Sequence, residues 1–189
     1  MRFNMKKYSG FSLIEVLITL LLTAVGILGM VAMQSRAIHQ TQDAVQRNTA
    51  IMLVNELVDI MRANSSEIFS LRPPHVPLYM NPKDTSIFYK AKGTTFSTGT
   101  CNDPSAAKTA QQQLDCWVAK LNSSLPIDAD TLKDHTYICF SSSKGSCNGG
   151  STIEIQLAWQ VKQDTCLVEA GGDAAPDNET CFYRTRVEL

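Results

Sequence analysis

The longest apolar stretch of the chain runs from Phe11 to Met33 and holds one charged residue, Glu15. At about 1.5 Å rise per residue, a helix over this stretch spans roughly 34 Å. The hydrocarbon core of a bilayer is about 30 Å thick. The stretch therefore predicts a transmembrane helix over residues 11–33 with a carboxylate near its start.

Polarity rises after this stretch, but the helical pattern persists over residues 34–70. No proline occurs before Pro73, and Ile38, Val45 and Met52 recur every seven residues. The apolar face then widens, through Ile51, Leu53, Val54, Leu57, Val58, Ile60 and Met61. We expect one helix up to about Ser66, with its amphipathic second half covered by the domain that follows.

Two glycines, Gly26 and Gly29, lie within the predicted membrane segment. Each lowers helix propensity by up to about 1 kcal/mol. They are either close-packing positions against another helix or a place where the helix loosens in an assembly, and the sequence leaves both readings open.

Short strands and turns replace the helical pattern over residues 71–189, where we expect a globular α/β domain. The clearest strand is Thr152–Val161, in which every second residue is apolar. Further strands are expected over 136–140 and 182–189, while 86–89 fits a strand or a loop. Consecutive strands joined by loops favour an antiparallel sheet with one face on the long helix and one facing water. The predicted class is α+β.

One helix is expected inside this domain. Asp103 followed by Pro104 fits an N-cap and a first helical position. The helix would carry apolar residues at the spacing of a buried stripe: Leu114, Trp117, Val118 and Leu121.

All six cysteines lie in the C-terminal half, and an even number in a loop-rich region indicates disulfides formed in an oxidising compartment. Fifteen pairings are possible, and sequence alone does not choose among them. We expect chain neighbours to pair, as Cys101–Cys116, Cys139–Cys147 and Cys166–Cys181. The last pair brackets a polar loop, 164–180, that is either a partner surface or a stapled solvent loop. The competing reading is a metal site, but no C-x-x-C occurs and no histidine stands at ligand spacing.

Basic residues flank the apolar stretch unequally. Arg2, Lys6 and Lys7 precede it, and Arg36 alone follows closely. The positive-inside rule places the N-terminus in the cytoplasm and the remainder in the periplasm. The cysteines favour the same topology.

Glu15 needs a partner, because an ionised carboxylate at membrane depth costs about 2.5–3.5 kcal/mol. Cleavage between Gly10 and Phe11 would create a positive charge one helical turn earlier, the α-ammonium of Phe11. We therefore expect a membrane anchor that becomes competent after processing. A carboxylate that meets a neighbour's N-terminal ammonium would also fix the axial register of the two helices.

The segment Gly10-Phe11-Ser12-Leu13-Ile14-Glu15-Val16, behind a short basic leader, resembles the class III signal of type IV pilins and of the pseudopilins of type II secretion. The resemblance implies a pilin-like fold and a leader peptide over residues 1–10. It also implies that prepilin peptidase cuts after Gly10 and N-methylates Phe11, and that Glu15 acts in assembly.

The layout of the whole chain, with Ala158-Trp159-Gln160 in its clearest strand, is similar to that of minor pilins. This implies a subunit that primes pilus assembly, with other minor pilins, the major pilin, a tip adhesin and the inner membrane as partners. A minor pseudopilin of type II secretion is an alternative that the six cysteines disfavour. A ligand- or DNA-binding pilin is another, but it would need a basic strip.

No catalytic or nucleotide-binding motif occurs in the sequence. His39, His75 and His135 lack metal-ligand partners at a suitable spacing, and Asp128 with Asp130 fits a turn. The net charge of −1 gives no sign of a nucleic-acid surface. We expect a structural subunit without a cofactor or metal, and a substrate of a peptidase rather than an enzyme.

Overall fold

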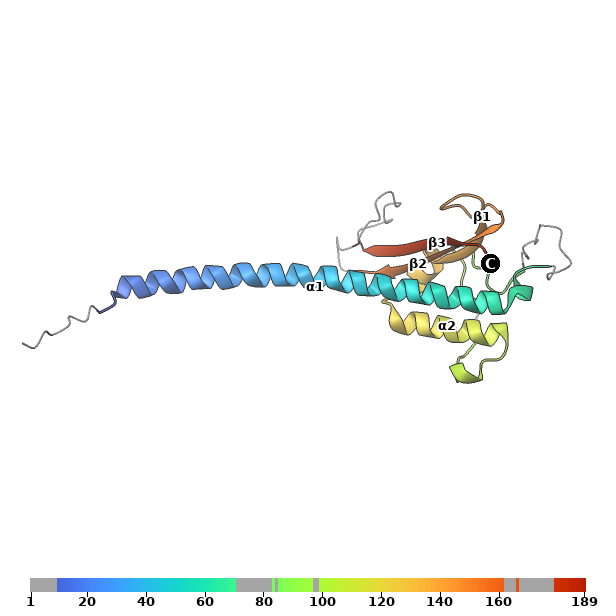
Figure 1. Ribbon diagram of the computed structural model, residues 1–189, viewed down its shortest axis with the longest axis horizontal. Coiled ribbons are helices and arrows are strands. Elements are labelled where there is room, and N and C mark those ends of the chain that lie inside the picture. Colours follow the sequence, from blue (N-terminus) through green and yellow to red (C-terminus); the bar gives the residue numbers. More distant parts are fainter. Residues whose placement is uncertain (1–9, 71–82, 84, 97–98, 162–165, 167–178) are drawn as a thin grey trace, which may run out of the picture. The chain divides into compact units, whose positions relative to one another are not determined.

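The computed structural model describes residues 10–70, 83, 85–96, 99–161, 166 and 179–189. The chain forms two compact units, residues 1–41 and 42–189, and each is described by itself. The helix α1 (Leu13–Ala63) runs through the boundary between them (Figure 1). The basic leader residues, His75, Pro73 and most of the 164–180 loop lie outside the described residues.

The first unit contains the apolar part of α1. Every described residue up to Thr41 is exposed, and an 18-residue window of the helix has a mean hydropathy of 2.5 with none of it buried. Among the described residues, α1 is the one helix that is long and apolar enough to cross a membrane. The predicted apolar helix is therefore confirmed, and it begins two residues later than Phe11.

The end of α1 comes slightly earlier than the predicted Ser66. The side chain of Asn64 donates to the Ile60 carbonyl oxygen at 2.8 Å and so satisfies one of the last backbone acceptors of the helix. A short 3-10 helix, η1 (Ser65–Glu67), follows. Polar residues that bond to nearby backbone end a helix in this way.

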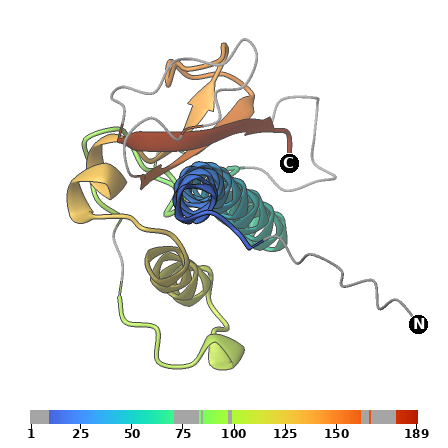
Figure 2. The same ribbon diagram turned by 90° about the vertical axis from the view of Figure 1, so that its left-hand side faces the viewer.

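The second unit has three layers. Figures 1 and 2 show the sheet on one side of the second part of α1 and the helix α2 (Ala110–Ser124) on the opposite side. The helix thus buries two faces, which explains why its apolar stripe is too wide for a solvated helix. Its buried apolar residues are Ala50, Leu53, Val54, Leu57, Val58 and Met61.

The sheet has three antiparallel strands in the order β1-β2-β3. They are β1 (Tyr137–Ser141), β2 (Thr152–Gln160) and β3 (Thr180–Val187). Ile138 in β1 lies opposite Ile155 in β2, which in turn lies opposite Thr185 in β3. The predicted α+β class with an antiparallel sheet is confirmed.

The second face of the sheet differs from the prediction, because it does not face water along β2. Glu154, Gln156 and Ala158 alternate with the core residues of this strand but are also buried. The connection between β1 and β2 folds back over Glu154, where the Gly145 N–H donates to its carboxylate, and a disulfide from Cys139 to Cys147 ties the connection to β1. Periodicity predicts which residues share a face, but it does not say what covers that face.

The predicted helix start at Asp103 is wrong by several residues. Asp103 caps only a 3-10 helix, η2 (Pro104–Ala106). The helix α2 starts with its own capping box, in which Thr109 accepts from the Gln112 backbone and the Gln112 side chain accepts from the Thr109 backbone. The expected buried stripe of α2 is confirmed, with Leu114, Trp117, Val118 and Leu121 all inside the core.

Asp128 and Asp130 belong to a helix rather than to a plain turn. Asp128 is the N-cap of α3 (Ala129–Asp134), and its carboxylate accepts the Thr131 backbone N–H at 2.7 Å. Hydrogen bonds from the Thr131 side chain and backbone lower the pKa of Asp128. Asp130 lies in the first turn, where the helix dipole favours a negative charge.

Residues 86–89 form turns, not a strand. Of the two alternatives that the sequence left open, strand or loop, the loop is therefore observed, and next to it a single bridge pairs Lys90 with Ile138, with backbone bonds of 2.9 Å in both directions. Within the described residues, the edge of β1 is therefore paired at one residue, Lys90, and not by a fourth strand.

Candidate functional site

The head of α1 carries the predicted processing site in an accessible form. Gly10 and Phe11 precede the helix, and Phe11 is 84% exposed. The Ser12 carbonyl oxygen accepts the backbone N–H groups of Glu15 at 3.0 Å and Val16 at 3.3 Å, which starts the helix one residue later. The bond between Gly10 and Phe11 therefore lies outside regular structure, where a peptidase can bind it in an extended form.

Glu15 lies in the first turn of α1. A carboxylate at this position gains about 0.3–1 kcal/mol from the helix dipole. This is less than the roughly 2.5–3.5 kcal/mol that the charge costs at membrane depth. The helix itself therefore offsets only part of the cost of a charge at membrane depth.

Phe11 can supply a cation only after cleavage, because its nitrogen is a neutral amide in the uncut chain. Phe11 and Glu15 are four residues apart, which is about 6 Å along a helix axis. An ammonium at Phe11 would therefore lie about one helical turn from Glu15 along the helix axis. It could pair with Glu15 of its own chain or with that of a neighbouring chain.

The apolar part of α1 satisfies its own hydroxyl groups. Thr19 donates to the Val16 carbonyl oxygen and Thr23 to that of Leu20, both at 2.9 Å. Backbone-bonded hydroxyls of this kind are compatible with lipid. This segment suits a bilayer apart from Glu15.

Gly26 and Gly29 have open space around them. A methyl group built on either α-carbon would meet no neighbouring atom within 4 Å. Contacts inside this chain therefore do not require glycine there, and packing against another helix and local loosening both remain explanations.

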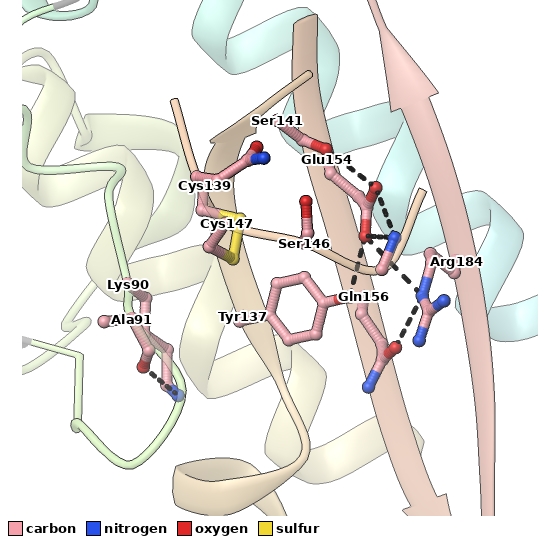
Figure 3. Close-up of a disulfide and its surroundings, with 12 residues drawn as sticks. Lys90, Ala91, Tyr137, Cys139, Ser141, Ser146, Cys147, Glu154, Gln156 and Arg184 are labelled. Carbon is pink, nitrogen blue, oxygen red and sulfur yellow. Dashed lines mark hydrogen bonds and ion pairs between the residues drawn. A yellow bond between two sulfur atoms is a disulfide. The ribbon is translucent and has the colours of Figure 1, made fainter. Parts of the chain in front are cut away.

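The second unit holds a buried polar cluster around Glu154, which the sequence patterns did not predict (Figure 3). The Glu154 side chain is fully buried and accepts from the Tyr137 hydroxyl at 2.7 Å and from the Gly145 backbone N–H at 2.9 Å. The Ser141 hydroxyl donates to its other oxygen at 3.2 Å. The carboxylate therefore joins both neighbouring strand segments and the loop above them.

Two arginines lie beside the carboxylate of this cluster. Arg184 Nε lies 3.6 Å from one Glu154 oxygen and donates to the Gln156 side chain at 2.8 Å. Arg186 Nε lies 3.9 Å from the other oxygen. An acid in the middle of the strongest strand and alternating arginines in β3 were the sequence signals for this arrangement. They are readable only once the register of β2 against β3 is known.

Lys90 is a second buried charge, with 1% of its surface exposed. Its ammonium donates to the carbonyl oxygens of Thr136 and Lys133, the latter at 3.0 Å. Burial lowers its pKa to about 8, although Asp134 acts in the opposite direction. The side chain therefore ties the loop after residue 85 to the end of α3 and the start of β1.

Three disulfides are present in the second unit. They join Cys101 to Cys116, Cys139 to Cys147 and Cys166 to Cys181, which are the chain neighbours expected to pair. The first pair links the segment before α2 to that helix, and the last links residue 166 to β3.

An open groove of about 760 Å³ lies between the second part of α1 and α2. Its charged residues are already paired, with Lys120 at 2.7 Å from Glu56 and Arg62 at 3.6 Å from Asp59. Met52, which lines the groove, is 71% exposed. The groove is thus mainly apolar, and the charged side chains at its edges form ion pairs with each other.

Neither a metal cluster nor a histidine-based site forms within the described parts of the chain. They contain no group of three or more histidine, cysteine, aspartate or glutamate side chains that could hold a metal ion. His39 is exposed on α1, and His135 ends α3 with its carbonyl oxygen accepting from Gln156 at 2.7 Å.

Comparison with known families gives two adjacent matches. Residues 5–31 match the prokaryotic N-terminal methylation motif, and residues 32–72 match the family of type IV pilin Tt1218. No curated protein and no solved structure matches the chain. The first match contains Gly10, Phe11 and Glu15, so it covers the whole of the predicted processing and assembly site.

Proposed function

We propose that this chain, a type IV pilin by its N-terminal segment, acts as a minor pilin that helps to initiate pilus assembly after prepilin peptidase has removed residues 1–10. The observation that carries the proposal is Glu15, a lone carboxylate in the first turn of an exposed apolar helix. Helices that join a bundle have to satisfy this charge. The N-terminal ammonium of a neighbouring subunit, at Phe11 or its equivalent, is the group best placed to do so.

The proposed topology has the N-terminus in the cytoplasm, α1 anchored in the inner membrane and the second unit in the periplasm. The basic leader before the apolar segment supports this orientation. Three disulfides in the second unit support an oxidising compartment for it. Incorporation into the extracellular pilus would follow from assembly at the membrane.

The minor role rests on the layout of the whole chain, which is similar to that of the type IV pilus modification protein PilV. The similarity supports a complex with other minor pilins that primes polymerisation of the major pilin, with a tip adhesin as a further partner. A minor pseudopilin of type II secretion remains the main alternative. A DNA-capturing pilin is less well supported, because the net charge is −1.

Substitution of Glu15 tests the proposed assembly role. We expect Glu15→Ala and Glu15→Gln chains to be inserted and cleaved but to be depleted from the sheared fibre fraction by at least roughly tenfold, as expected for the loss of more than about 1.4 kcal/mol of pairing. The matched control is Asp59→Ala, which removes an exposed carboxylate of the same helix. Normal incorporation of both Glu15 variants would refute the assignment.

A deletion strain separates the three candidate functions. The proposal predicts loss of surface fibres and twitching with normal protein secretion. Loss of secretion with intact fibres would instead identify a pseudopilin, and loss of transformation alone would identify a DNA-binding pilin. Complementation with the wild-type chain is the control for each phenotype.

A further inference from the structure

The loop over residues 142–151, which joins β1 to β2, covers the outer face of the sheet with very few attachments. It consists mainly of serine and glycine and holds no apolar side chain apart from Cys147. Outside the disulfide, three hydrogen-bonding groups of the loop bond to the sheet: Gly145 N–H donates to both Glu154 oxygens, Gly149 N–H donates to the Phe140 carbonyl oxygen at 3.1 Å, and the Ser143 carbonyl oxygen accepts the Ser141 hydroxyl. Hydrophobic burial therefore contributes little to holding the loop in place.

The disulfide that ties this loop down contains the most exposed of the six cysteines. Cys147 is the exposed residue among the six cysteines, and the other five are buried or half-buried. Its partner Cys139 is 2% exposed in β1. A thiolate from solvent can therefore approach Cys147, because access controls the rate of thiol–disulfide exchange.

Ordering of the loop carries a high entropic cost. Gly145, Gly149 and Gly150 all have positive φ angles, of 82°, 83° and 133°, a region in which glycine is ordinarily needed. Gly150 also passes so close to β1 that a methyl group on it would lie 2.7 Å from the Ser141 carbonyl oxygen. A glycine-rich segment held in one path gives up much conformational freedom, so loss of its one covalent tie favours opening.

We propose that Cys139–Cys147 is a redox latch, a disulfide that exchanges with a dithiol protein or small dithiol at Cys147 and thereby opens the loop over Glu154. One thiolate of the dithiol attacks Sγ of Cys147, the bond to Cys139 breaks, and Cys139 leaves as a thiolate that takes up a proton. The second thiolate of the dithiol then attacks the dithiol sulfur that is bonded to Cys147, and the two sulfurs of the dithiol form a disulfide. This step releases Cys147 as a thiolate, which takes up a proton from water, and it leaves the dithiol oxidised by two electrons to a disulfide.

Opening of the loop changes which side chains are exposed on the outer face of the sheet. Glu154 exchanges the Gly145 N–H for water, and the carboxylate becomes accessible beside Arg184 and Arg186. The buried side chains of Tyr137 and Gln156 lie on the same face. The chain thus has a closed, oxidised face and an open, reduced face with exposed aromatic and charged groups. The two thiols stay eight residues apart, so reclosure needs only a short loop.

Graded reduction tests this inference on the full chain in detergent. Samples equilibrated with increasing dithiothreitol are alkylated with iodoacetamide, and labelled cysteines are identified by mass spectrometry. We expect Cys139 and Cys147 to be labelled at a dithiothreitol concentration roughly tenfold below that needed for the other four cysteines. Earlier or simultaneous labelling of Cys101 with Cys116, or of Cys166 with Cys181, would overturn the proposal.

Hydrogen exchange tests whether reduction opens the loop. In a Cys139→Ala/Cys147→Ala chain, exchange of amides 142–151 should accelerate by about tenfold or more, while the amides of α2 keep their protection. A Cys101→Ala/Cys116→Ala chain is the matched control and should leave the 142–151 amides unchanged. Unchanged protection of the loop in the first variant would contradict the latch. Glu154→Gln should accelerate exchange at Gly145 in the oxidised chain, whereas Glu188→Gln, at an exposed carboxylate after β3, should not.

Discussion

Two carboxylates, Glu15 and Glu154, lie among apolar residues in the sequence, and the chain provides for them differently. Glu154 receives hydrogen bonds from Tyr137, Ser141 and Gly145 and two arginine contacts within its own unit. Glu15 lies on an exposed helix whose dipole offsets only part of the cost of its charge. Glu154 therefore serves the stability of this chain, whereas we propose that the partner of Glu15 comes from processing and assembly.

Removal of the Glu154 carboxylate should be strongly destabilising. In Glu154→Leu, the buried contacts of this carboxylate with Tyr137, Gly145 and two arginines are lost. We expect the free energy of unfolding to fall by about 3–5 kcal/mol, the range for breaking a buried ion pair. Urea denaturation of the oxidised chain measures this. The control Glu188→Leu should shift the free energy by no more than about 0.5 kcal/mol, and an equal effect of both changes would contradict the role of Glu154.

Lys90 predicts a pH dependence of stability with a definite sign. Its pKa falls from the ordinary lysine value of 10.5 to about 8 in the folded chain, because burial disfavours its charge. Between these values the unfolded chain holds a proton that the folded chain has released. The contribution of Lys90 to the free energy of unfolding therefore rises with pH through this window, by about 3 kcal/mol in total.

The comparison variant for this effect is Lys90→Met, in which the rise over the same pH window should be absent. Titration of the Lys90 ε-carbon resonance by NMR gives the midpoint directly. We expect the midpoint near pH 8, and a midpoint at the ordinary lysine value of 10.5 would refute the account of its burial.

Among the helices and strands, the start of α2 offers a clean test of local sequence signals. Thr109 and Gln112 form a reciprocal capping box, whereas Asp103 caps only three residues of 3-10 helix. Thr109→Ala should therefore lower the free energy of unfolding by about 1 kcal/mol. Asp103→Ala should lower the free energy of unfolding by less. If thermal or chemical denaturation showed a larger loss for Asp103→Ala than for Thr109→Ala, the cap at Asp103 would be the more important one.

The elements show which sequence signals are sufficient and which are not. Alternation of apolar residues predicted β2 to within one residue at its end, and helical spacing predicted the buried side of α2. Both patterns are local. The start of α2 was misplaced because aspartate before proline caps a 3-10 turn as well as an α-helix. The covered outer face of the sheet could not be predicted, because it depends on how the 142–151 loop folds back over Glu154.

For the candidate site, the sequence was most informative where the residues of the site are close together along the chain. Gly10, Phe11 and Glu15 form one short motif, so their spacing alone defines it. The cluster of Glu154 with Arg184 and Arg186 is assembled across strands. It becomes visible only with the register of β2 and β3, which alternation does not supply.

At the level of the entire molecule, the two units differ in how their apolar residues are used. The second unit has its own core, built on the second part of α1, the sheet and α2, and is stapled by three disulfides. The first unit exposes an apolar helix segment with no buried residue in the 18-residue window. Such a surface needs lipid or neighbouring helices, which agrees with a pilin that moves from a membrane into an assembly.

The identity of the N-terminus in cells tests the central claim of a processed pilin most directly. Intact-mass analysis of the chain purified from membranes is compared between cells with and without prepilin peptidase. With the peptidase, we predict a chain that lacks residues 1–10 and begins with N-methylated Phe11; without it, we predict that residues 1–10 remain attached. A chain from peptidase-containing cells that keeps Gly10, or that begins after the apolar segment, would contradict the account.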